Sequence, residues 1–261
     1  MQRDNRVKKS ILTIAGFDPI SGAGVVRDTQ IFVEKGLYPL VCITSIVPQT
    51  TCKILEVFAL SGETVLKELE AIYTEFKPEF VKVGLVPLPE LMESILYLLR
   101  TKQLSCLIID PIIKAGTGDP LASNKIKEAI LGNPLPNTII TPNIKEAEFL
   151  TGLRIESFED VKKAAERLEN YGFKGVLIKG GHGKGNQIQD VFLYENEFQI
   201  FTHPRFPHEI HGTGCTLSSL ILSFIALGHS PPEAVEKSIR EIENWIKNGK
   251  LIKLSCSYVF Q

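Results

Sequence analysis

The chain has almost no net charge, no long hydrophobic run and no closely spaced pair of cysteines. Its 261 residues contain 29 Lys and Arg against 30 Asp and Glu, which leaves a formal net charge of −1. This balance provides no basic field for nucleic acid or for an anionic membrane surface. No run approaches the roughly 18 apolar residues that a membrane span requires, and the apolar run at 11–15 is too short for a signal peptide. The composition therefore argues against nucleic-acid and membrane partners.

The five cysteines are odd in number and contain no Cys-x-x-Cys spacing. Zinc ligands and the disulfide frameworks of small secreted proteins have characteristic cysteine spacings, and none is found here. We therefore expect reduced thiols and a cytoplasmic protein.

Short apolar runs alternate with amphipathic stretches along the chain. The runs predict strands at 11–15, 40–47, 80–85, 106–110, 138–141 and 175–179. The amphipathic stretches predict helices at 25–35, 64–75, 88–102, 124–131, 157–171, 213–227 and 232–247. Apolar runs of four to eight residues are typical of strands buried on both faces of a parallel sheet. Two further strands, 189–194 and 198–203, flank the turn Glu195-Asn196-Glu197 and predict a hairpin.

This alternation predicts the α/β class. We expect one domain over residues 1–261, built as a three-layer α/β/α sandwich around a mostly parallel central sheet with an antiparallel edge. Ligands of such sheets bind beyond the carboxyl ends of the strands. Residues that follow different strands can therefore converge on one site, namely Gly16, Gln49, Leu85, Asp110, Asn143 and Lys179.

The most informative stretch is a glycine-rich turn that leads into an apolar helix, His211-Gly212-Thr213-Gly214-Cys215-Thr216-Leu217-Ser218-Ser219. Gly212 and Gly214 can adopt backbone angles that other residues resist. The first N–H groups of the helix lack helical partners, and with the helix dipole they form an anion site. Cys215 would lie among these N–H groups as a nucleophile or base. The alternative is a loop that only caps the helix, with Cys215 as a small buried thiol.

The other polar candidates each have a structural and a functional interpretation. Asp110 and Glu146 are carboxylates of the kind that Mg²⁺ prefers, but they could equally be a strand-end turn residue and a first-turn helix acid. Lys179 could hold a phosphate, or it could be an exposed turn lysine. Gln49 offers a donor and an acceptor to an aminopyrimidine, or it is a polar loop residue.

Several motifs accompany the glycine-rich turn in a definite order. They are Ala15-Gly16-Phe17-Asp18-Pro19-Ile20-Ser21-Gly22-Ala23-Gly24, Lys82-Val83-Gly84-Leu85, Asp110-Pro111, Thr141-Pro142-Asn143-Ile144-Lys145-Glu146-Ala147-Glu148 and Lys179-Gly180-Gly181-His182. Over residues 10–245 this series resembles the ribokinase-like ATP-dependent kinases. Within them it is similar to the hydroxymethylpyrimidine/phosphomethylpyrimidine kinases of thiamine biosynthesis.

The resemblance implies a ribokinase-like fold and a phosphotransferase that uses ATP and Mg²⁺. It implies 4-amino-5-hydroxymethyl-2-methylpyrimidine as the acceptor, then its monophosphate, with both steps in one site. It also implies a homodimer. We expect no nucleic-acid or membrane partner, and a small molecule as the substrate.

The resemblance also implies roles for individual residues. It places Cys215, Gly212, Gly214 and Asp28 at the transferring group, with Asp28 facing the acceptor. Gln49, Gly16 and Leu85 are implied as acceptor contacts, Lys179, Asn143, Thr213 and Gly181 as ATP contacts, and Asp110 and Glu146 as the Mg²⁺ site. Because a helix N-terminus lowers a thiol pKa, we expect Cys215 to favour the thiolate. His182 is interpreted as structural or solvent-facing.

Some positions depart from the family pattern. Ile20-Ser21, Pro48, Thr50 and Leu85 differ around the acceptor, and the tail 251–261 matches no pattern. Three alternatives remain open: a pyridoxal or pyridoxine kinase, a non-catalytic pyrimidine- or nucleotide-binding regulator, and a dinucleotide-binding oxidoreductase. The last is weaker because Arg27 stands where Gly-x-Gly-x-x-Gly requires its third glycine.

Overall fold

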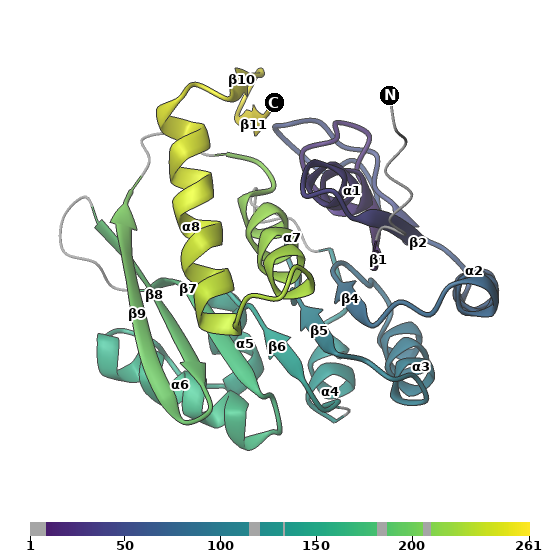
Figure 1. Cartoon of the computed structure of the whole chain (residues 1–261), viewed down its shortest axis with the longest axis horizontal. Coiled ribbons are helices and arrows are strands. Elements are labelled where there is room, and N and C mark those ends of the chain that lie inside the picture. The colour runs from purple at the N-terminus through teal and green to yellow at the C-terminus, as the bar shows by residue number, and fades with distance from the viewer. Residues whose placement is uncertain (1–8, 115–120, 133, 182–186, 206–209) are drawn as a thin grey trace.

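A nine-stranded sheet forms the middle layer of the molecule (Figure 1). The computed structural model describes residues 9–114, 121–132, 134–181, 187–205 and 210–261. The strand order is β3-β2-β1-β4-β5-β6-β7-β8-β9. The strands are β1 Ser10–Phe17, β2 Tyr38–Ile46, β3 Phe58–Ala59, β4 Phe80–Val83, β5 Cys106–Ile109, β6 Thr138–Ile140, β7 Gly175–Gly181, β8 Gln187–Tyr194 and β9 Glu197–Pro204.

The sheet is parallel in its centre and antiparallel at both edges. The strands from β2 to β7 in the sheet order pair in parallel. β8 and β9 add the predicted antiparallel edge, and their hairpin turns at Glu195 (φ 51°) and Asn196 (φ 64°), as a turn with two left-handed residues does. The mostly parallel sheet is confirmed. Sequence analysis missed β3, which pairs antiparallel with β2 at the other edge, because a two-residue strand has no periodicity.

Helices cover both faces of the sheet, which completes the predicted three layers. One face carries α1 Gly24–Glu34, α7 Thr213–Ala226 and α8 Pro231–Lys247. The other carries α2 Gly62–Glu75, α3 Pro89–Arg100, α4 Ile126–Leu131, α5 Ile144–Thr151 and α6 Phe158–Asn170. None of these helices is long and apolar enough to span a membrane.

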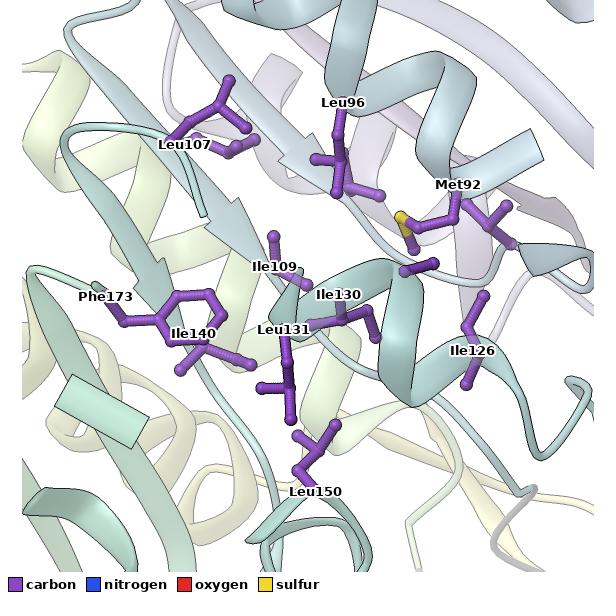
Figure 2. Packing of buried hydrophobic residues seen from close by; sticks show 14 of the residues in the cluster. Met92, Leu96, Leu107, Ile109, Ile126, Ile130, Leu131, Ile140, Leu150 and Phe173 are labelled. Carbon is purple, nitrogen blue, oxygen red and sulfur yellow. The ribbon is translucent and has the colours of Figure 1, made fainter. Parts of the chain in front are cut away.

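The side chains of each strand point alternately to the two faces of the sheet, and a hydrophobic core lies on each face. Leu12 and Ile14 of β1 point to the core under α2 and α3, while Ile11 points to the core under α1 and α7, because successive strand residues face opposite sides. Figure 2 shows the larger core between α3, α4 and β5, where apolar side chains from all three elements interlock. The labelled contacts include Met92, Leu96, Leu107, Ile109, Ile126 and Ile130. This packing holds the carboxyl ends of the central strands in place.

Side-chain caps set the beginnings of α2, α5, α6 and α8, and two of them bear on the sequence-based predictions. Ser157 begins α6 in a capping box with Asp160, as its position before an acidic first turn predicts. Asn143 and Glu146 form another capping box at the start of α5, a helix that the sequence analysis did not delimit. At eight residues α5 is too short for a clear apolar period.

The expectation that all cysteines are free is wrong. Cys52 and Cys256 form a disulfide, with their Cα atoms 5.2 Å apart, whereas Cys42, Cys106 and Cys215 are free and buried. The partners lie 204 residues apart in the sequence, so no local spacing could reveal the pair. The cytoplasmic location stays a prediction.

We expect Leu96→Ala to lower the free energy of unfolding by about 2–5 kcal/mol, because it leaves a cavity in a close-packed core. Leu96 is fully buried in the cluster of Figure 2. Its neighbour Tyr97 is 74% exposed, so Tyr97→Ala should stay within about 0.5 kcal/mol of the parent protein. Urea denaturation of the two variants measures the difference. Equal destabilisation by both would contradict this description of the core.

Candidate active site

A cavity of about 270 Å³ opens at the carboxyl ends of the central strands, against the start of α7. Its size suits a small molecule rather than a macromolecular segment. The six residues predicted to converge from separate strands all line it: Gly16, Gln49, Leu85, Asp110, Asn143 and Lys179. Glu146 and the turn Gly212–Cys215 line it as well. The structure therefore brings together the residues that sequence reasoning had grouped.

The turn before α7 lines this cavity at the N-terminus of the helix, where the first N–H groups have no helical partners. Gly212 precedes the helix with a φ of +78°, and a side chain at this position would overlap the carbonyl oxygen of Gly22. A Cβ on Gly214 would come within 3.2 Å of the Lys179 Nζ atom. A helix N-terminus and a lysine ammonium therefore face the same space. This combination suits a phosphate group.

Asp110 and Lys179 form a buried ion pair beside this turn. Lys179 Nζ lies 2.9 Å from Asp110 Oδ1. The Ser218 hydroxyl of α7 and the Thr141 hydroxyl also donate to the Asp110 carboxylate, at 3.1 and 3.2 Å. Burial alone would raise the pKa of Asp110, but Lys179 and then Lys82 outweigh it and hold that pKa below its usual value. Asp110 is therefore ionised at neutral pH.

Glu146 has a structural role and a place in the site at once. Its Oε2 atom accepts from the N–H of Asn143 at 2.8 Å, and the Asn143 side chain accepts from the N–H of Glu146 at 2.9 Å. Burial raises the pKa of Glu146 to about 7, with Lys179 opposing and Asp110 reinforcing the shift. A cation near this carboxylate would favour its ionised form. Glu146 therefore both caps α5 and lines the cavity.

A second cavity of about 650 Å³ adjoins the first. The two share Lys114, Asn143, Glu146 and Lys179 in their walls. The rest of the second wall consists of Ile113, Ile144, Phe149 and Gly180, with Asn124 and Lys145 as polar side chains. Gly181, predicted at the nucleotide, ends β7 opposite Gln189. His182 lies outside the described residues. Because both cavities have Lys179 in their walls, two ligands could meet end to end at this residue.

The first cavity is closed on its other side by Gln49, Gly16 and Leu85. Gln49 follows β2 and forms an isolated bridge with Ile54, which shapes the loop around it. The Thr44 hydroxyl donates to the Leu85 carbonyl at 2.6 Å and fixes the segment after β4. A Cβ on Gly16 would come within 2.8 Å of the Ser45 hydroxyl oxygen. These constraints keep the amide of Gln49 and the side chain of Leu85 at the cavity wall.

Asp28 does not face the acceptor side, which corrects the expectation for this residue. It is fully buried, and its carboxylate pairs with Lys82 Nζ at 2.5 Å. The hydroxyls of Thr13 and Ser219 also donate to it, at 2.6 and 2.7 Å. Helical periodicity turns Asp28 toward the sheet rather than toward the loop at the start of α1. Lys82 also donates to the carbonyl of Cys215 at 3.1 Å, so the Asp28–Lys82 pair connects the first turn of α7 to strand β4 of the sheet.

Cys215 also departs from its expected electrostatics. It is only 6% exposed. Burial raises its pKa to about 11, although Lys82 and the N–H of Gly24 act in the opposite direction. The expected preference for thiolate is therefore wrong, because the loss of hydration outweighs the helix N-terminus and the nearby lysine.

Sequence reasoning missed a clasp between Asp18 and His211. The Asp18 carboxylate accepts the N–H groups of Ile20, Gly22 and Ala23, and it lies 2.9 Å from His211 Nε2. Burial alone would raise the pKa of Asp18, but His211 and the N–H donors lower it. The clasp ties the first glycine-rich loop to the second. Both residues lie in the motifs discussed above, and a charged side chain inside a glycine-rich motif was the available signal.

Lys82 and Ser218 were missed for a different reason. Lys82 interrupts an apolar strand and is fully buried, which by itself signals a buried partner of opposite charge. Ser218 stands among small helical residues, and nothing in the sequence distinguishes it from them. Its contact with Asp110 exists only because α7 packs across β5.

The family model of phosphomethylpyrimidine kinase matches residues 18–256 of this chain. The chain belongs to this family. A hydroxymethylpyrimidine/phosphomethylpyrimidine kinase of Staphylococcus aureus is 38% identical over 88% of this chain and 85% of its own length. The solved phosphomethylpyrimidine kinase of Clostridium difficile is 35% identical, with a TM-score of 0.80 over 92% of this chain and all of its own.

A pyridoxal kinase of Staphylococcus aureus, solved with AMP-PCP and pyridoxal, is also similar. It is 28% identical, with a TM-score of 0.87 over 98% of this chain and 93% of its own. The comparisons confirm the predicted fold and a phosphotransferase of this family, in place of a dinucleotide-binding oxidoreductase.

The raised pKa of Cys215 predicts how its alkylation depends on pH. With a pKa of about 11, the rate with iodoacetamide should rise about tenfold per pH unit from pH 7 to 10, because only the thiolate reacts. Peptide mass spectrometry would measure modification at position 215, with Cys215→Ala as the control for peptide assignment. A rate that levels off below pH 8 would contradict the raised pKa and would support the original expectation that Cys215 is a thiolate at neutral pH.

Proposed function

We propose that this protein transfers the γ-phosphoryl group of ATP to 4-amino-5-hydroxymethyl-2-methylpyrimidine and then to its monophosphate, as in thiamine biosynthesis. The observation that carries the proposal is the meeting of two cavities at Lys179, beside the N–H groups of the Gly212–Cys215 turn. One cavity is then for the acceptor and the other for the nucleotide. The transferring phosphoryl group lies between them.

The acceptor side offers one side chain for an aminopyrimidine. The amide of Gln49 can donate to a ring nitrogen while it accepts from an exocyclic amine. Leu85 and Val47 line the same cavity and provide apolar contact for the ring. Such a site matches the acceptor that the family resemblance implies.

Asp110 and Glu146 fit a Mg²⁺ ion. Both carboxylates line the first cavity, while the described part of the chain contains no cluster of three or more metal-binding side chains. This agrees with Mg²⁺, which keeps several waters and relies on phosphate oxygens for other ligands. The ion, when bound, neutralises charge on the phosphates. Lys179 and the backbone N–H groups of the turn would hold the phosphate oxygens by charge and hydrogen bonds.

The chain supplies positioning rather than a strong base. Phosphoryl transfer passes through a loose transition state, so the acceptor hydroxyl need not lose its proton before the transfer. Asp28 is engaged with Lys82, and the raised pKa of Cys215 keeps its thiol protonated at neutral pH. What remains is in-line placement: Gln49 orients the acceptor, and the turn holds the phosphoryl group.

A pyridoxal or pyridoxine kinase is the second candidate. The solved pyridoxal kinase matches 98% of this chain, and pyridoxal also bears a hydroxymethyl group on a heteroaromatic ring. Higher sequence identity with the pyrimidine kinases favours the first candidate. The departures from the family pattern lie on the acceptor side: Leu85 lines the first cavity, and Pro48 precedes Gln49. They therefore bear on which ring the site accepts.

We also propose a homodimer. Apolar side chains are exposed together on α1 and on the β2–β3 edge of the sheet, among them Val33, Val41, Ile46 and Phe58. Light scattering would measure the mass of the particle in solution. A monomer at all concentrations would refute this part of the proposal.

A coupled assay of ADP release tests the proposed function directly. Purified protein would receive ATP, Mg²⁺ and one of three acceptors: hydroxymethylpyrimidine, its monophosphate or pyridoxine. We expect the highest kcat/KM with the two pyrimidines. Preference for pyridoxine would favour the second candidate, and binding of a pyrimidine without turnover would indicate a regulator.

We expect Glu146→Gln to lower kcat by about 10- to 100-fold, because a charge-assisted contact contributes roughly 1.5–3 kcal/mol. The Mg²⁺ concentration for half-maximal rate should rise as well. Glu63→Gln is the matched control, since Glu63 is an exposed acid in the first turn of α2. It should leave both values unchanged. Parent-like turnover in Glu146→Gln with an unaltered Mg²⁺ requirement would remove Glu146 from the ion site.

A further inference from the structure

The tail that matched no sequence pattern forms a hairpin beside the active site. After α8, the strands β10 Leu251–Lys253 and β11 Tyr258–Phe260 pair antiparallel. Figure 1 shows them beyond the end of α8, on the side of the molecule where α7 begins. Ser257, Val259 and Phe260 are buried, so the hairpin is packed onto the domain.

The turn of this hairpin is bonded to the loop that carries Gln49, residues 48–56, which is called the acceptor loop below. The disulfide joins Cys256 to Cys52, three residues beyond Gln49. The N–H of Cys256 also donates to the Thr51 hydroxyl at 3.3 Å. Otherwise the loop is closed mainly by its own bonds, such as the Thr50 N–H to the Lys53 carbonyl at 2.9 Å. Cys52 and most of its neighbours in the loop are exposed, so little core packing holds this loop in position.

The strand β11 is hydrogen-bonded to the segment that leads into the Gly212–Cys215 turn. The N–H of His211 donates to the carbonyl of Tyr258 at 2.8 Å, and Ile210 forms a parallel bridge with Tyr258. Cys256 and Tyr258 are only two residues apart. A short path of covalent and hydrogen bonds therefore runs from the acceptor loop, through the hairpin, to the residue that precedes Gly212.

The far end of β11 is anchored to the helix that begins at this turn. The Arg27 guanidinium lies 5.0 Å from the ring centre of Phe260 and 5.5 Å from that of Trp245. Its Nε atom donates to the Thr216 hydroxyl of α7 at 3.0 Å. Phe260 also packs edge-on against Trp245. Because β11 is fixed to α7 and α8, a displacement of the acceptor loop cannot be absorbed by movement of the hairpin.

We propose that the C-terminal hairpin, through the Cys52–Cys256 disulfide, is a positioning element that holds the Gln49 loop in register with the Gly212–Cys215 turn. The proposal rests on the acceptor role of Gln49 proposed above. With the disulfide formed, the loop is ordered before the acceptor arrives. With the disulfide reduced, acceptor binding must order the loop, and the free energy of ordering is lost from the affinity.

Reduction of this bond is chemically straightforward. Both cysteines are exposed, so a thiolate of dithiothreitol can attack one sulfur, and the second thiol of the reagent then releases the other. The protein gains two electrons and two protons as two thiols, and the reagent becomes its cyclic disulfide. Cys42, Cys106 and Cys215 are free thiols, so the reductant leaves them unchanged.

The experiment compares the oxidised and the dithiothreitol-reduced enzyme by steady-state kinetics and by amide hydrogen exchange. On reduction, we expect the KM for hydroxymethylpyrimidine to rise about 3- to 10-fold, as the loss of one preordered loop implies, while the KM for ATP stays unchanged. Exchange should accelerate at residues 48–56 of the loop. Reoxidation with glutathione disulfide should restore both readouts.

Variants separate positioning from simple cross-linking. Cys52→Ser should reproduce the reduced enzyme and no longer respond to dithiothreitol, while Lys53→Ala, in the same exposed loop, should behave as the parent does. A disulfide that only stabilises the fold would lower Tm on reduction and leave the ratio of the two KM values unchanged. That result, or unchanged exchange at 48–56, would overturn the proposal. Faster exchange in a protein that neither binds nor phosphorylates the pyrimidine would instead refute the proposed function and leave the ordering of the loop established.

Discussion

The first turn of α7 rests on two buried lysine–aspartate pairs, and the active site depends on them. Lys82 with Asp28 holds the carbonyl of Cys215, and Asp110 with Lys179 reaches the same turn through Ser218. Removing one partner of a buried pair commonly costs about 3–5 kcal/mol, because the other charge is left without compensation. The turn is therefore fixed relative to β4, β5 and β7 before any ligand arrives.

A fixed turn explains why the chemistry here calls for placement more than for a base. The carboxylate of Asp28 is committed to Lys82, and the thiol of Cys215 is protonated at neutral pH. The groups that remain available are backbone N–H donors, one lysine and two carboxylates at a cavity wall. In the proposed function these groups neutralise and orient phosphate, which is what a loose transition state needs.

The fold was largely predictable because its signals are local. Uninterrupted apolar runs such as 106–110 required strands buried on both faces, and Ser157 before an acidic turn required a helix start. Convergence of the site followed from parallel strands, which end at one edge. β3 and α5 were missed because short elements have no measurable period. The direction in which Asp28 points and the pKa of Cys215 could not be predicted, because both depend on side chains that reach them from distant elements.

By itself, the sequence determined the class of fold, the glycine-rich turn before α7 and the set of residues that could meet around it, since each depends on glycine positions or on periodicity within a few residues. The tertiary structure decided which of those residues face the cavity, which are held in ion pairs and which cysteines join. Cys52 and Cys256, Asp18 and His211, and Lys82 and Cys215 are all distant in the chain and in contact in the molecule. Such contacts arise only when helices and strands pack together, and burial together with the neighbouring charges decides which of these groups are ionised.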